Sequence, residues 1–279
     1  MDVRTALGLE PMDSMFRWRL PVGPRTITGG NFLFGGCGLG AAVEALEAAS
    51  GRPCVWAAAQ FLSYAKAGSV VHIDVTLANQ GRNTTQARAV AKVDDREIFT
   101  VNAALGSRNF PHEGQFAECP VVPDPQVCPE RQFRIEYGPS VNDLFDQRIA
   151  MGRTIDQLDG TRGPGRHAMW VRFVDDIEMS GAALGILGDW VPSGIHQALG
   201  IHAGGNSLDN TIRIVKIVPT EWVLLDVRLH AIANGFAHGL VHIWTQDGTL
   251  LATASQSTIV REWRDFPKLK SRKTQEQES

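Results

Sequence analysis

The chain has few of the features that mark secreted, membrane-spanning or metal-binding proteins. Only 4 of its 279 residues are cysteine, and no two of them form a Cys-x-x-Cys pair. We therefore expect neither a disulfide framework nor a zinc site. No apolar run reaches the ~18 residues of a transmembrane helix, and residues 1–13 lack the apolar segment of a signal peptide. A cytoplasmic protein that does not enter the membrane is expected.

The chain also lacks an excess of positive charge. Lys and Arg number 27 against 30 Asp and Glu, which gives a net charge of −3. No basic field is present, so a nucleic-acid partner is not expected. Hydrophobic residues make up 43% of the chain, which is ordinary for a globular protein. An enzyme or a ligand-binding protein remains, built as one domain or as two of roughly 140 residues.

The first half of the sequence predicts a helix followed by an antiparallel meander. Residues 36–50 are rich in Ala and Gly, and Gly51-Arg52-Pro53 ends the helix. Strand-like runs follow, separated by turn residues such as Gly, Asn and Asp. These runs are residues 54–64, 70–78, 84–93 and 98–105.

Residues 107–130 interrupt this pattern. They contain five prolines, at positions 111, 120, 123, 125 and 129, among polar residues. A wrapped surface loop and a disordered connector are both compatible with this composition.

The second half repeats the order of the first. Residues 181–200 predict a helix in which Pro192 introduces a kink or starts a new turn. The strand-like runs after it are residues 207–218, 222–233, 236–245 and 250–260. A shift of 152 positions overlays Val71 on Val223 and Asp95 on Asp247, which supports an internal repeat. We therefore expect an α+β fold with an N-terminal half (1–106), a Pro-rich linker with connecting strands (107–165), a C-terminal half (166–263) and a charged, frayed tail (264–279).

Two tandem units of this kind resemble the double hotdog fold, and the sequence resembles the acyl-CoA thioesterase II (TesB-like) family. The resemblance covers roughly residues 15–263. The stretches that carry it are Phe34-Gly35-Gly36, residues 207–212, 221–225 and 245–248, and Leu251-Ala252-Thr253-Ala254-Ser255-Gln256. It implies hydrolysis of acyl-CoA to a free acid and coenzyme A, without a metal or redox cofactor.

The resemblance also implies the site residues. The family uses an Asp on the second helix, a Thr or Ser hydroxyl at the start of the next strand and a Gln near the last strand. These correspond to Asp189, Ser207 and Gln256. Many relatives have Thr where this chain has Ser207, which keeps the hydroxyl and loses a methyl group that restricts its rotamer.

These residue types suit thioester hydrolysis. Asp189 can accept a proton from water, while Ser207 and Gln256 can orient that water by donating and accepting hydrogen bonds. Gly35, Gly36 and Cys37 lie at the start of the first helix, where free amides favour negative charge. We expect the amide of Gly36 or Cys37 to contact the developing oxyanion.

The repeat predicts a single site. The shift of 152 positions places Gln256 on Ala104, Ser207 on Val55 and Asp189 on Cys37. None of these three positions in the first half offers a side-chain oxygen. Only one of the two related positions would then carry the catalytic groups.

Structural roles for these polar residues also stay open. Asp189 can cap a helix, and Ser207 or Gln256 can be ordinary strand residues. Asp209 follows Ser207 at strand spacing and suits a structural hydrogen bond. Cys37 lies where its pKa could be lowered, but no His partner is evident.

The histidines do not form a metal-binding pattern. His230, His238 and His242 lie on adjacent predicted strands, without an evident carboxylate or further ligand. His196 does not have the five-residue spacing from Asp189 that would favour an enoyl-CoA hydratase.

A hotdog protein that binds acyl thioesters or another apolar ligand without hydrolysing them is the main alternative. Convergence of Asp189, Ser207 and Gln256 on one cavity would favour the hydrolase. A homodimer is expected. The sequence does not specify the acyl chain.

Overall fold

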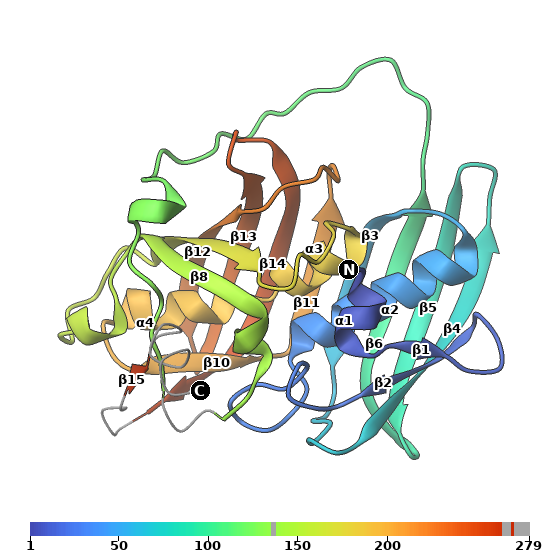
Figure 1. Ribbon diagram of the computed structural model, residues 1–279, viewed down its shortest axis with the longest axis horizontal. Coiled ribbons are helices and arrows are strands. Elements are labelled where there is room, and N and C mark those ends of the chain that lie inside the picture. Colours follow the sequence, from blue (N-terminus) through green and yellow to red (C-terminus); the bar gives the residue numbers. More distant parts are fainter. Residues whose placement is uncertain (135–137, 264–268, 271–279) are drawn as a thin grey trace.

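The computed structural model describes residues 1–134, 138–263 and 269–270. Its main feature is a 13-stranded sheet in which every pairing among the described strands is antiparallel. The strands follow the order β1-β2-β4-β5-β6-β3-β11-β14-β13-β12-β9-β8, and β10 pairs with β14 outside this path. The sheet curves around two central helices, α2 and α3 (Figure 1).

The strands of the first half are β1 (Glu10–Pro11), β2 (Arg17–Pro21), β3 (Cys54–Phe61), β4 (Val70–Gln80), β5 (Thr84–Val93) and β6 (Arg96–Gly106). The later strands of the sheet are β8 (Phe145–Met151), β9 (Arg166–Phe173), β10 (Ala203–Ser207), β11 (Asp209–Ile214), β12 (Val223–Ala233), β13 (Phe236–Thr245) and β14 (Leu250–Glu262). A separate pair joins β7 (Phe133–Arg134) to β15 (Leu269–Lys270).

The helices are α1 (Val3–Leu7), α2 (Gly35–Ser50), α3 (Gly181–Leu187) and α4 (Gly194–Leu199). Short 3₁₀ turns lie at η1 (Pro125–Val127), η2 (Val141–Leu144), η3 (Ile155–Gln157) and η4 (Val191–Ser193). No helix among the described residues is both long enough and apolar enough to cross a membrane.

The predicted α+β architecture with two helix-plus-antiparallel-sheet halves is confirmed. The ranges expected for β5 and β13, residues 84–93 and 236–245, agree with the structure. In β5 every second side chain from Thr85 to Ala91 is buried and the alternate residues are more exposed, as expected for a strand with one face against a core.

Some elements were not predicted. β2 alternates exposed Arg17 and Arg19 with fully buried Trp18 and Leu20, and it borders β4 at the edge of the first half. β9 pairs with β12, so it belongs to the sheet of the second half. β8 lies within the predicted connecting strands, residues 107–165, and pairs with β9. Most of the predicted frayed tail, residues 264–279, lies outside the described residues.

The two halves share one sheet and one core. β3 pairs with β11, so that Asp209 lies opposite Gln60 and Arg213 opposite Trp56. The core is continuous across this seam, from Leu46 in the first half to Ile186 in the second. α2 and α3 cross closely at Gly40, where an added Cβ would lie 2.7 Å from the backbone oxygen of Ala182. The seam and the helix crossing bring the first half against the second where the candidate site lies.

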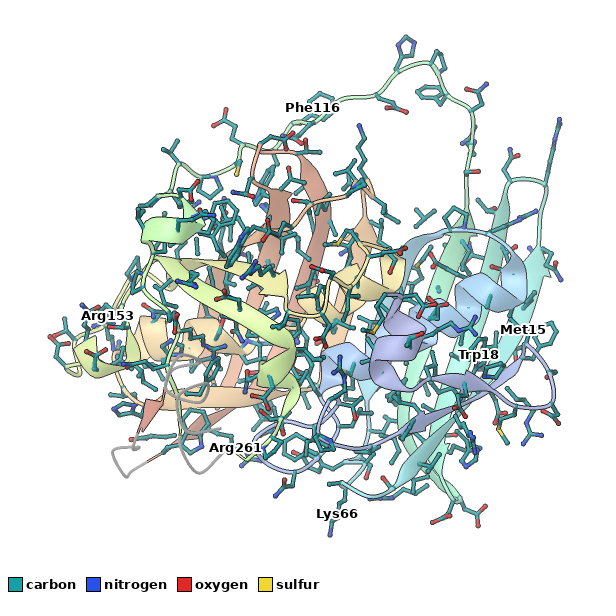
Figure 2. The ribbon with its side chains drawn as sticks, in the orientation of Figure 1. Met15, Trp18, Lys66, Phe116, Arg153 and Arg261 are labelled. Atoms are coloured by element: carbon teal, nitrogen blue, oxygen red, sulfur yellow. The ribbon has the colours of Figure 1, made fainter. Side chains whose placement is uncertain are left out.

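The Pro-rich linker is a wrapped segment over part of its length. Gln115 accepts a hydrogen bond from the Leu250 amide (2.7 Å) and donates one to the Gly248 carbonyl (3.0 Å). Beyond it, Cys119 and Cys128 pack against an apolar cluster that contains Trp170, Trp222 and Trp244. Before Gln115 the chain forms an arm that leaves the body of the protein, and Figure 2 shows the Phe116 side chain near its end.

Candidate active site

Asp189 lies at a break between two helices. The sequence predicted one helix over residues 181–200, but α3 ends at Leu187 and helical turns resume only at η4. Pro192, at the start of η4, has no N–H to donate to the carbonyl four residues earlier, so an α-helix running through it would lose that hydrogen bond. The expected position of Asp189 on the second helix is therefore corrected to the segment just after that helix, and its side chain is only 5% exposed.

Ser207 is positioned by an irregularity in strand pairing. Ser207 lies opposite Thr258, whereas Thr211 lies opposite Ser255, so four steps along β10–β11 match three along β14. Such a β-bulge turns side chains away from their regular direction. The Asp209 carboxylate accepts a hydrogen bond from the Ser257 amide at 2.7 Å, which confirms the structural role expected for Asp209. The sequence predicted that Ser207 starts a strand. The structure corrects this, because Ser207 is the last residue of β10.

Gln256 lies in β14 with its side chain directed into the core, where it is 3% exposed. Its Oε1 accepts a hydrogen bond from the Val191 amide at 3.0 Å. Val191 follows the break between α3 and η4, so this hydrogen bond links that segment to β14. The contact leaves the Nε2 group of Gln256 directed at the other site residues.

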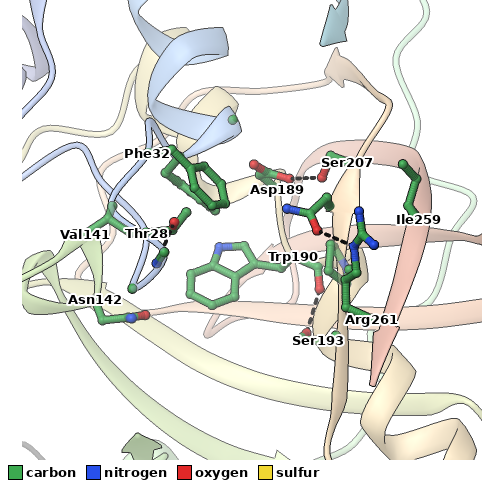
Figure 3. Close-up of a pocket in the computed structure, with 18 of the residues that line it drawn as sticks. Thr28, Phe32, Val141, Asn142, Asp189, Trp190, Ser193, Ser207, Ile259 and Arg261 are labelled. Carbon is green, nitrogen blue, oxygen red and sulfur yellow. Dashed lines mark hydrogen bonds between the residues drawn. The ribbon is translucent and has the colours of Figure 1, made fainter. Parts of the chain in front are cut away.

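The three side chains meet. Gln256 Nε2 donates to Ser207 Oγ at 2.9 Å and also to Asp189 Oδ1. Ser207 Oγ donates to Asp189 Oδ1 at 3.2 Å. Figure 3 shows Asp189 and Ser207 facing each other on the wall of a cavity. A carboxylate, a hydroxyl and an amide thus converge from three separate segments.

The first half contributes the start of α2. The Gly36 amide donates to Asp189 Oδ2 at 2.6 Å. An added Cβ at Gly36 would lie 2.6 Å from the Ile186 carbonyl oxygen and 3.0 Å from Asp189 Cβ, so glycine permits this approach. The Gly36 amide is therefore engaged with the carboxylate instead of being free for an oxyanion.

Burial dominates the electrostatics of Asp189. Removal from water raises the pKa of this carboxyl, while hydrogen bonds from Gln256, Gly36 and Ser207 act in the opposite direction. No salt bridge to Asp189 is found within the described residues. The group is therefore a stronger base than an exposed aspartate.

The cavity has a volume of about 750 Å³ and is lined by residues of both halves. Its apolar wall includes Phe32, Phe34, Phe61 and Val141. Positive charge comes from three lining side chains, Arg131, Arg153 and Arg261. Such a cavity suits a ligand with an apolar part and an anionic part.

Comparison with known proteins identifies the family. The acyl-CoA thioesterase N-terminal domain model matches residues 24–106, and the acyl-CoA thioesterase C-terminal domain model matches residues 116–260. The chain belongs to the acyl-CoA thioesterase family. No curated protein sequence matches it significantly.

One solved structure agrees with this membership, and two others share the fold. A protein assigned as a thioesterase, from Novosphingobium aromaticivorans DSM 12444, is 32% identical with a TM-score of 0.82, over 89% of this chain and 97% of that one. A hotdog-fold protein from Alicyclobacillus acidocaldarius (19% identity, TM-score 0.80) covers 94% of this chain and 98% of its own. The acyl-CoA thioesterase II TesB2 of Mycobacterium marinum (20% identity, TM-score 0.73) covers 96% and 100%. The predicted double hotdog fold is confirmed.

The remaining candidates of this thioesterase-family chain have different surroundings. Gly35 lines the cavity, whereas Cys37 is fully buried and is not among the described lining residues. Burial and the charge of Asp189 raise the pKa of the Cys37 thiol, which corrects the expectation that a helix N-terminus would lower it. Within the described residues, no three His, Cys, Asp or Glu side chains are grouped to hold a metal ion.

Sequence reasoning missed Trp190. This residue follows Asp189, lines the cavity and is 6% exposed. Its position directly after the proposed base was the one available signal, because its burial and orientation depend on the folded core.

Proposed function

We propose that this protein hydrolyses acyl-CoA thioesters to a free acid and coenzyme A. The observation that carries the proposal is the convergence of Asp189, Ser207 and Gln256 on one cavity. Membership of the acyl-CoA thioesterase family supports the substrate class.

In the proposed reaction, a water molecule at the trio attacks the thioester carbonyl carbon. Asp189 accepts one proton of that water as general base. Ser207 and Gln256 form hydrogen bonds to this water and orient its oxygen toward the carbonyl carbon. Holding the two reactants in a fixed geometry lowers the entropic part of the barrier. The bonds to Gly36, Ser207 and Gln256 hold the carboxylate in place.

The tetrahedral intermediate then expels the thiolate of coenzyme A. A new C–O bond forms, the C–S bond breaks, and the proton held by Asp189 passes to the thiolate or to solvent. Since a thiol has a pKa of about 8.5, the thiolate is a good leaving group and needs no dedicated acid. The reaction needs no metal ion for these steps.

The cavity supports an acyl chain as the apolar part of the substrate. Phe32, Phe34 and Phe61 provide the apolar wall, and the arginines provide positive charge for the phosphates of coenzyme A. The cytoplasmic location, a role in fatty acid metabolism and the homodimer remain predictions.

A free-thiol assay with acyl-CoAs of several chain lengths tests the proposal. Wild type should release coenzyme A, and Asp189→Asn should lower kcat by about 10²–10⁴-fold, since general base catalysis contributes this much. Asp74→Asn is the matched control, because Asp74 is a half-exposed residue paired with Arg17 outside the cavity. If no chain length releases thiol while an acyl-CoA binds, the protein is an acyl-thioester-binding hotdog protein instead.

A further inference from the structure

The indole of Trp190 carries a buried N–H with no hydrogen-bond partner among the described residues. A buried polar group left unpaired costs about 1–3 kcal/mol, so native proteins rarely keep one without a use. Trp190 is also a lining residue of the cavity that holds Asp189 and Ser207. In Figure 3 the nitrogen-bearing edge of the indole faces the side of the cavity where Phe32 and Asp189 lie.

The ring is held on several sides. Phe34 packs at a centroid distance of 6.2 Å, and Phe145 meets it edge-on at 5.7 Å. The Arg131 guanidinium lies over the ring, 5.3 Å from its centroid, and donates a hydrogen bond to Gln147 at 2.7 Å. These contacts hold the ring in place. Its Nε1 atom is covered by neighbouring atoms, so a substrate oxygen meets the N–H when a covering side chain shifts as the substrate enters.

Hydrolysis needs a donor for the oxygen that becomes negative. The groups that orient the water are bonded to one another, and the Gly36 amide is engaged with Asp189. The Cys37 amide belongs to a residue outside the described cavity lining. The positive charge of Arg131 against the indole adds favourable potential for an oxyanion.

We propose that Trp190 Nε1–H donates a hydrogen bond to the thioester carbonyl oxygen and stabilises the oxyanion that develops on it. This inference rests on the proposed thioesterase function. It adds a catalytic residue to Asp189, Ser207 and Gln256, and it places base and oxyanion donor on consecutive residues of the helix break.

Trp190→Phe tests the inference, because it keeps an aromatic ring in the core and removes the N–H. Loss of one oxyanion donor lowers kcat by roughly 10²–10³-fold, and we expect this fall with little change in KM. Trp190→His, which returns a ring N–H, should recover part of the loss. Trp244→Phe is the matched control. Trp244 is fully buried, and its Nε1–H likewise has no partner in the described part of the chain, but it lies in the outer apolar cluster and is not among the described residues that line the cavity.

A spectroscopic measurement separates a catalytic role from a packing role. A non-hydrolysable ketone analogue of acyl-CoA, bound to wild type, should show its C=O stretch at lower frequency than when bound to Trp190→Phe. Equal frequencies together with an unchanged kcat would overturn the inference and leave the Gly35 amide as the donor to test. A wild-type enzyme that releases no thiol would instead refute the proposed function itself. If Trp190→Phe does not fold, incorporation of 3-benzothienylalanine at position 190, which keeps the bicyclic shape and has no N–H, is compared with wild type by the same two readouts.

Discussion

The Asp189 carboxylate combines burial with hydrogen bonds that hold its charged form. Burial raises its pKa, so the protonated, inactive form persists to higher pH than in an exposed aspartate. Since only the ionised form accepts a proton, kcat/KM should rise with pH, with an acidic limb centred above the ordinary range of aspartate. Rates measured from about pH 4 to 8 check this expectation. A limb at the ordinary aspartate pKa would contradict the environment described for Asp189.

Ser207 should influence both that limb and the rate. Its hydroxyl donates to the charged form of Asp189, and this bond lowers the pKa of the carboxyl. Ser207→Ala should therefore move the acidic limb to still higher pH. It should also lower kcat roughly tenfold or more, the usual worth of a hydrogen bond to a charged group. Ser207→Thr keeps the hydroxyl and serves as control, with a limb that stays in place. An unchanged limb in Ser207→Ala would refute this coupling.

At the residue scale, the proposed polar groups could be identified from the sequence and Trp190 could not. Asp189, Ser207 and Gln256 came from a family resemblance, and their mutual contacts follow from the helix break and the β-bulge. An unpaired indole N–H is a property of packing, which requires the coordinates of Phe34 and Phe145. The sequence also could not show that the Gly36 amide, which was expected to contact the oxyanion, donates its hydrogen bond to the Asp189 carboxylate.

At the scale of elements, the crossing of α2 and α3 sets the distance between the halves. Gly40→Ala would place a Cβ 2.7 Å from the Ala182 backbone oxygen, which no side-chain rotation relieves. Overpacking costs about 1–3 kcal/mol, partly offset by the ~1 kcal/mol preference of helices for Ala over Gly. We expect a net loss of up to about 2 kcal/mol in the free energy of unfolding, measured by denaturant titration. Gly23→Ala, with no atom within 4 Å of its added Cβ, should change it by about 0.5 kcal/mol or less.

The helices also explain where the repeat was misaligned. An added Cβ at Gly35 would lie 2.7 Å from Asp189 Oδ2, and one at Gly181 would lie 2.8 Å from Glu47 Oε1. Each helix start thus faces a carboxylate of the other half. The shift of 152 positions paired Asp189 with Cys37, whereas these contacts make Glu47 its counterpart. The second half has a break between α3 and η4, whereas α2 is continuous. A constant shift in residue number therefore aligns the strands of the two halves but not their helices.

Strands were predicted best where one face is buried and turns are short. β5 and β13 have both properties, and their ends are marked by turn residues. β9 is buried on nearly every residue, so it lacks the alternation that identifies a half-exposed strand. β10 is short and contains two glycines, which weaken its pattern.

For the whole molecule, the seam between β3 and β11 makes the halves one cooperative unit. The shared core runs from α2 to α3, and the cavity takes its walls from both halves. Each half alone would expose the edge of its sheet and part of this core to water. Separate expression of residues 1–106 and 107–279 should therefore yield fragments without a cooperative thermal transition. A cooperative transition in either fragment would show that it is an independent domain.

The covalent link between the halves should be dispensable once the chain has folded. Within the arm, the backbone of residues 108–114 makes no hydrogen bond recorded among the described residues, and Phe110 is 61% exposed. Limited chymotrypsin treatment should cut there first, since exposed segments without backbone bonds are preferred sites. The two fragments should co-elute as one species on gel filtration, because the β3–β11 ladder and the α2–α3 packing still join them. They should separate in denaturant. Thiol release should persist in the nicked protein, since the arm does not line the cavity within the described residues. Fragments that separate under native conditions would show that the linker, and not the shared sheet, holds the two halves together.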